Sequence, residues 1–79
     1  MIVKVRLWHP EAQGFTGKDY CYHTPLPVTI NGKVVAPTRS NPMQAGVVTQ
    51  TDVDPSTLSL SLLYHLNEVT DFWRGELPQ

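Results

Sequence analysis

The 79-residue sequence has a single cysteine and lacks any apolar run of about eighteen residues, the length that a membrane-spanning helix requires. One cysteine, Cys21, cannot form an intramolecular disulfide, and such sparse cysteine use is typical of a reducing compartment. The N-terminal segment alternates charged with apolar residues, whereas a signal peptide has a continuous apolar stretch. We therefore expect a cytoplasmic protein with no membrane-spanning segment.

The residue patterns of catalysis and metal binding are also missing. Gly-rich phosphate loops, Cys-x-x-Cys pairs and His-Glu-x-x-His motifs do not occur. Asp52 and Asp54 belong to a strand end and a helix cap, and not to a general acid/base pair. Cys21 is expected to be a buried structural residue and not a nucleophile. No standard zinc spacing joins the possible ligands, which are His9, Cys21, His23 and His65. We expect no metal, no cofactor and no enzymatic activity.

The net charge is only −1, but its sign is unevenly distributed. Residues 1–40 hold five basic and two acidic side chains, a balance of +3, whereas residues 41–79 hold one and five, a balance of −4. Ordinary solubilising charge is one interpretation of this asymmetry. A basic face that meets an anion or a nucleic acid is the other. A dedicated duplex-DNA binder is usually far more basic.

Seven prolines and five glycines favour short strands and turns over long helices. Period-two alternation predicts a first strand over residues 2–8, with Val3, Val5 and Leu7 facing the core. Residues 9–18 contain two glycines and a proline without any period, which predicts a surface loop. Runs of β-branched and aromatic residues predict further strands at residues 19–24, 33–36 and 45–53.

Turn-forming residues separate these strands. Asn31-Gly32 favours a tight turn with positive φ, which predicts a hairpin between residues 28–30 and the third strand. Gly46 is expected to mark a bend or bulge in the fourth strand.

The last third of the chain predicts one helix and a closing strand. Asp54-Pro55 is a good helix start, and leucines follow at positions 58, 62 and 66, so we predict a short helix over about residues 55–66. The alternation of leucine with serine there also fits a strand. Residues 67–73 fit either a continuation of the helix or a strand, and we predict a strand that closes the sheet. Residues 74–79 are expected to be a frayed tail.

The predicted fold is one mostly β domain over residues 1–79, a small five-stranded SH3-like or OB-like barrel with one short helix. Closing so short a sheet removes most of its exposed edges. The expected core consists of Val3, Val5, Leu7, Val34, Val47, Leu58, Leu62, Leu66 and Val69.

Aromatic and basic side chains are the candidate binding residues. Tyr20 and Tyr22 share one strand face, where they could stack on bases or serve as ordinary sheet residues. Trp8 lies on a charged face, where it either packs over the barrel rim or contacts a partner. Arg39 lies at the tip of a polar turn, free to contact a phosphate or carboxylate. The full candidate set is Trp8, Tyr20, Tyr22, Lys33, Arg39, Phe72 and Trp73.

The central stretch resembles a known small barrel. Tyr20-x-Tyr22-x-x-Pro25, Gly32-x-Val34-Val35-x-Pro37 and Gly46-Val47-Val48 are similar to the N-terminal domain of primosomal replication-restart helicases, which binds the 3′ end of a DNA strand. Short uncharacterised proteins of phages and mobile elements show the same pattern. The resemblance covers about residues 19–53, under half of the chain, and implies a small β-barrel that binds single-stranded DNA.

One position departs from the helicase pattern. In that domain an acidic residue between the two aromatic positions helps to hold the terminal nucleotide. Cys21 occupies this place here and cannot take the acidic group's role. A general strand-binding face of Tyr20, Tyr22, Lys33 and Arg39 does not depend on it.

Three functions are therefore hypotheses. The first is a non-catalytic phage or mobile-element accessory protein in the host cytoplasm that binds a host protein, since a near-zero net charge suits a protein partner. The second is a single-stranded nucleic-acid-binding module. The third is a self-associating module that buries Phe72 and Trp73 in a symmetric interface. The chain is expected to be a monomer or a small homo-oligomer.

Overall fold

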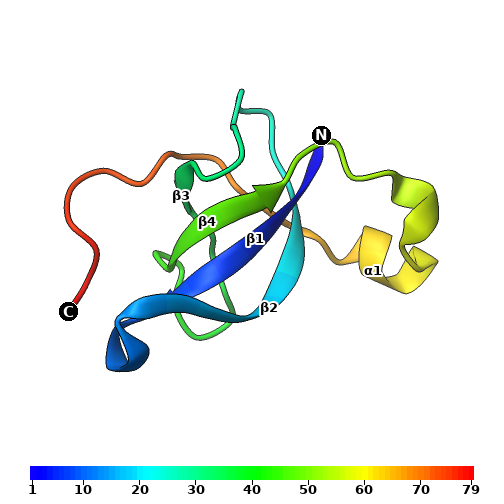
Figure 1. Cartoon of the computed structure of the whole chain (residues 1–79). Coiled ribbons are helices and arrows are strands. Elements are labelled where there is room, and N and C mark those ends of the chain that lie inside the picture. Colours follow the sequence, from blue (N-terminus) through cyan, green and yellow to red (C-terminus); the bar gives the residue numbers. More distant parts are fainter.

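The computed structural model describes residues 1–79, whose strands form one strongly curled sheet (Figure 1). The strands are β1 Ile2–His9, β2 Gly14–His23, β3 Lys33–Val35, β4 Ala45–Gln50 and β5 Asn67–Glu68. The helical elements are η1 Pro10–Ala12, η2 Pro55–Thr57 and α1 Leu60–Tyr64. The strand order is β3-β4-β1-β2-β5. The prediction of a small, mostly β, barrel-like fold with one short helix is confirmed. No helix has the length and apolar character needed to cross a membrane.

Strand β1 lies at the centre of the sheet and pairs antiparallel with both β2 and β4. Its alternating sequence places Val3 and Val5 in the core with no exposed surface, and Leu7 is almost as deeply buried. Val34 and Val69 complete the fully buried part of the predicted core, so five of the nine predicted residues are confirmed. Burial of each such side chain stabilises the fold by about 1.5–3 kcal/mol.

The prediction that Val47 belongs to the core is wrong by one residue. The register places Val48 opposite Val5 and Val47 opposite Arg6. Successive side chains of a strand point to opposite faces, so Val48 is fully buried and Val47 lies on the outer face with Arg6. The same pairing brings the backbone of Gly46 against the core face of β1. Gly46 thus serves close packing, and the register irregularity lies further along β4.

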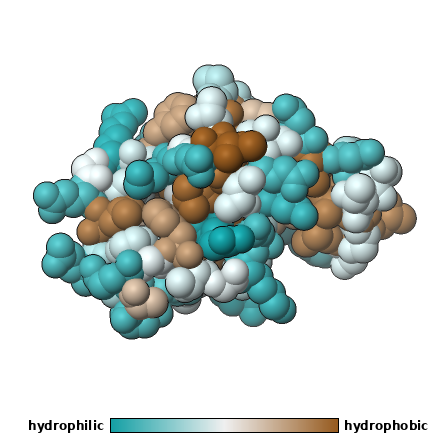
Figure 2. All heavy atoms as spheres, viewed as in Figure 1, coloured by the Kyte–Doolittle hydropathy of each residue, from teal (hydrophilic) through white to brown (hydrophobic).

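The predicted leucine stripe over residues 55–66 does not enter the core. The hydroxyl of Ser59 accepts a hydrogen bond from Leu62 N–H at 3.1 Å and begins α1 there, so the expected helix is divided into η2 and α1. No residue of α1 is buried, and Leu62 is 41% exposed. Leu58 and Leu66 are only half-buried. These helical turns project from the barrel, with apolar side chains visible at the right of Figure 2.

The loop predicted over residues 9–18 is largely part of β2. Only a short turn separates β1 from β2, which begins at Gly14. Pairing to β1 overrides the irregular local sequence, with Trp8 opposite Phe15 and Arg6 opposite Asp19. Three residues of β2 therefore stand opposite one residue of β1, and this bulge contains Gly17 at φ +87°.

The predicted turn at Asn31-Gly32 is confirmed, but the strand expected before it is absent. Asn31 adopts the expected positive φ of 73°. However, residues 28–30 form no strand, because the turn pairs directly with β4 instead. Asn31 N–H donates to Val48 O at 2.8 Å, and Gly32 O accepts from Val48 N–H at 2.9 Å.

Residues 67–73 close the sheet, as predicted, although as two short pairings and not as one continuous strand. At the first pairing, β5 runs parallel to the end of β2. Val69, which follows β5, continues this pairing because its N–H donates to His23 O at 2.8 Å. The segment then crosses to the opposite edge, and Phe72 forms a bridge with Val34 of β3. Val69, between the two pairings, has no exposed surface.

We predict that Gly46→Ala destabilises the protein by about 1–3 kcal/mol, the usual cost of overpacking a core. A Cβ at this position would collide with the Val5 side chain and meet Ala36 Cβ at 3.3 Å. Urea denaturation monitored by tryptophan fluorescence measures the loss. Gly14→Ala is the control, because a Cβ there meets nothing closer than 3.7 Å. Equal stabilities of the two variants would contradict this packing.

Candidate functional site

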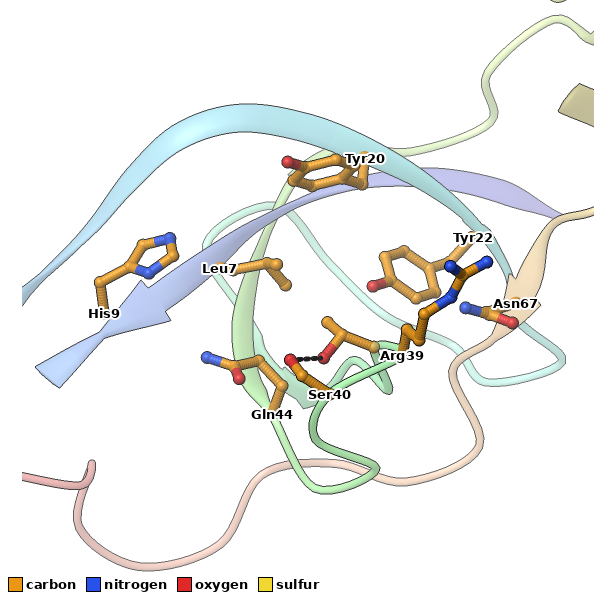
Figure 3. Close-up of a pocket in the computed structure, with 9 residues that line it drawn as sticks. Leu7, His9, Tyr20, Tyr22, Arg39, Ser40, Gln44 and Asn67 are labelled. Carbon is orange, nitrogen blue, oxygen red and sulfur yellow. Dashed lines mark hydrogen bonds between the residues drawn. The ribbon is translucent and has the colours of Figure 1, made fainter.

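The closure of the sheet leaves an opening beside β2. Strand β5 pairs with only Tyr22 and His23, so the earlier part of this β2 edge has no partner strand. A cavity of about 530 Å³ lies between β2 and the loop that joins β3 to β4 (Figure 3). It is lined by Leu7, His9, Tyr20, Tyr22, Thr38, Arg39, Ser40, Gln44 and Asn67.

Tyr22 and Asn67 close one end of the cavity. The Tyr22 hydroxyl donates to Pro37 O at 3.1 Å, and the Asn67 side-chain amide reaches the same oxygen at 3.5 Å. Burial raises the pKa of the Tyr22 hydroxyl, with a further contribution from Tyr20, so this group remains a donor at neutral pH. Tyr22 is only 4% exposed. Its ring therefore belongs to the core, and Tyr20 alone, 47% exposed, offers an open aromatic ring.

The loop opposite β2 is held by its own polar side chains. Thr38 N–H donates to Asn41 O at 2.9 Å, and the Thr38 hydroxyl accepts from Asn41 N–H at 3.1 Å. The Gln44 side-chain amide donates to Trp8 O and thereby ties the loop to the end of β1. Thr and Asn side chains commonly bond to nearby backbone groups in this way at turns. The loop therefore presents Arg39 from an ordered backbone.

Arg39 gives the lining of the cavity a positive formal charge. The charged or titratable lining side chains are Arg39, His9 and the two tyrosines, and no carboxylate lines the cavity. Arg39 is exposed and makes neither an ion pair nor a side-chain hydrogen bond. The Glu11 carboxylate lies beside this lining, with its Oε1 3.4 Å from His9 Nδ1. An unpaired guanidinium in a cavity without carboxylates is suited to an anionic group such as a carboxylate or a phosphate.

Arg6 of β1 and Asp19 of β2 form an ion pair on the outer face of the sheet. Arg6 Nε donates to Asp19 Oδ1 at 2.7 Å, and the Thr49 hydroxyl donates to Asp19 Oδ2 at 3.1 Å. The hydrogen bond from Arg6 lowers the pKa of Asp19, and the same bond raises the pKa of Arg6. This pair therefore does not compete for an anion in the cavity.

Trp8 contacts the C-terminal tail instead of the cavity. Its ring packs edge-on against Phe15, with ring centroids 5.0 Å apart, and its Nε1–H donates to Pro78 O at 2.7 Å. The end of the predicted frayed tail is thus held against β1. Trp73 is half-buried, and its Nε1–H donates to Glu76 O at 3.3 Å.

Of the seven candidate binding residues, the structure brings Tyr20, Tyr22 and Arg39 to one cavity. Lys33 is exposed on β3, and Phe72 is 39% exposed in the closing segment. Sequence reasoning missed the other lining residues. Thr38 and Ser40 lie in a polar turn, which is a signal that sequence reasoning could have used. No local pattern connects this turn with His9 and Asn67. No three His, Cys, Asp or Glu side chains come together as metal ligands would.

No protein-family model, curated protein or solved structure matches this chain.

We predict that Asp19→Asn lowers stability near neutral pH and that its effect disappears in acid. The folded-state pKa of Asp19 lies below the ordinary value of 3.8, because the carboxylate accepts from Arg6. The ion pair therefore stabilises the fold above pH 3.8 and is lost as the pH falls through the lower folded-state value. Thermal unfolding of both proteins between pH 7 and pH 2 measures the difference.

Asp71→Asn is the control for this experiment. Asp71 pairs with Arg74 at 3.6 Å on an exposed surface, where such pairs contribute little. A difference between wild type and Asp19→Asn that stayed the same at every pH would contradict the stabilising role of the charged pair.

Proposed function

We propose that this chain is a non-catalytic binding module that receives an anionic group of a protein partner in the cavity of the barrel opening. The observation that supports the proposal most directly is the unpaired Arg39 guanidinium, which Figure 3 shows extended toward Tyr22 and Asn67, in a cavity without carboxylates. A carboxylate accepts two parallel hydrogen bonds from a guanidinium, which orients the ligand as well as attracting it.

The size and lining of the cavity favour a small part of a larger partner. A volume of about 530 Å³ lies within the range of ligand pockets. Leu7 and the Tyr20 ring supply apolar surface beside the polar groups, a mixture that is typical of protein-binding anchors. The net charge of −1 also suits a protein partner better than a polyanion.

A single-stranded nucleic acid is the second candidate. The exposed ring of Tyr20 and the unpaired Arg39 line the same cavity, so one base could stack while a neighbouring phosphate meets the guanidinium. Tyr22 is buried in the core, which leaves a single aromatic ring for stacking and makes this candidate weaker. The phage or mobile-element origin and a host partner stay predictions.

We predict that Arg39→Gln weakens binding of a fluorescein-labelled glutamate-rich peptide about fivefold or more, since a charge-assisted hydrogen bond contributes ~1 kcal/mol or more. Fluorescence anisotropy at two salt concentrations measures the affinity. The fold should be unaffected, because Arg39 has no partner in the protein. Arg74→Gln is the control, as Arg74 is also exposed, lies outside the cavity and makes only a surface pair with Asp71.

The same titration with a labelled single-stranded oligothymidylate tests the second candidate. Stacking on Tyr20 would make Tyr20→Ala cost roughly 1–3 kcal/mol, with affinity that falls steeply as salt increases. Binding of the oligonucleotide but not of the peptide would overturn the protein-partner proposal. Peptide binding that is equal in wild type and Arg39→Gln would show that the cavity is not the site.

A further inference from the structure

We propose that the partner is an extended acidic segment that binds by adding a strand to the open edge of β2, beside residues 19–21, with an acidic side chain reaching Arg39. This inference rests on the proposed function, because it assumes that the cavity is the binding site. It specifies the conformation of the ligand, which the cavity alone does not.

The hydrogen bonds at the end of β2 show which main-chain groups face the open edge. Thr24 N–H donates to Met1 O at 2.9 Å and therefore points toward β1. His23 O accepts from Val69 N–H at 2.8 Å and therefore points away from β1. Main-chain groups alternate between the two edges along a strand. The odd-numbered residues at this end of β2 thus direct their N–H and C=O groups toward the open edge.

The open edge presents Asp19 N–H, Asp19 C=O and Cys21 N–H beside the cavity, since the parallel pairing of Tyr22 with Asn67 uses the Cys21 C=O. Strand β5 already occupies the next part of the same edge, where Tyr22 and His23 pair with an extended segment. The edge of β2 is therefore paired with β5 at residues 22–23 and has no partner strand at the residues before them. On the far side, the bulge at residues 16–18 interrupts the edge, which limits an added strand to a few residues.

The charges beside this edge favour an acidic ligand. Side chains of an added strand alternate between the two faces of the sheet, and those level with Tyr20 would enter the cavity. A glutamate on that face is suited to Arg39, which has no other partner. The Asp19 carboxylate, on the outer face, is already paired with Arg6 at 2.7 Å. Lys18 is exposed near the same edge and adds positive charge.

The test uses the full chain and a short synthetic peptide in which glutamate alternates with valine. Amide hydrogen exchange by NMR should slow about tenfold or more at Asp19 and Cys21 when the peptide binds, because these N–H groups gain acceptors. N-methylation of every second peptide residue in one register should weaken binding about tenfold by removing the donors to β2. N-methylation in the other register should have little effect.

The outcomes separate this inference from the proposed function. Arg39-dependent binding without slower exchange at Asp19 and Cys21, and with equal affinity for both N-methylated peptides, would overturn strand addition and leave the binding site intact. Absence of peptide binding would overturn both. An oligonucleotide that binds through Tyr20 and Arg39 while the peptide does not would assign the cavity to nucleic acid and also overturn the strand.

Discussion

The main-chain hydrogen bonds of residues 67–73 are the constraint on which the barrel depends. This single segment pairs with the edge of β2 at one end and with the edge of β3 at the other. At the β3 end, Val35 N–H donates to Asp71 O and Trp73 N–H donates to Lys33 O, both at 3.0 Å. Without these bonds both edges of a small sheet would be open, and the core beneath Val69 would meet solvent. Burial of a modest apolar core thus relies on a segment that has little regular structure itself.

The candidate site exists because this closure is incomplete. The segment covers β2 at its last two residues and then leaves for the opposite edge. The gap that remains is bridged at one end by Tyr22 and Asn67, which both bind Pro37 O. Elsewhere the gap is a cavity with an unpaired Arg39 at its rim. The proposed binding site therefore lies where the barrel lacks backbone pairing.

The outline of the fold could be predicted from sequence because it depends on local alternation. Val3, Val5 and Leu7 reveal the central strand without reference to any other element. Val47 and Val48 show the limit of such reasoning, because the register against β1 decides which of them is buried. In the same way, β2 extends through a glycine-containing stretch because β1 pairs with it, which no local pattern reveals.

The leucines of residues 58–66 mislead for a different reason. Their spacing fits an apolar stripe on a helix, but Ser59 begins a separate short helix, α1, in which no residue is buried. The cavity was even less accessible to prediction. Its lining comes from positions between 7 and 67, and only the closed sheet brings them together. Tyr20, Tyr22 and Arg39 could be named as candidates by residue type, whereas their separate roles depend on burial.

In this structure residues 67–73 close both edges of the sheet, and the edge of β2 stays open beside residues 19–21. Amide hydrogen exchange of the free protein tests this arrangement most directly. We expect slow exchange at Val35, Val69 and Trp73, whose N–H groups make the closing bonds. We expect fast exchange at Asp19 and Cys21, which face the open edge. Protection of Asp19 and Cys21 in the free protein, or fast exchange at Val69 and Trp73, would contradict this structure of the barrel and its opening.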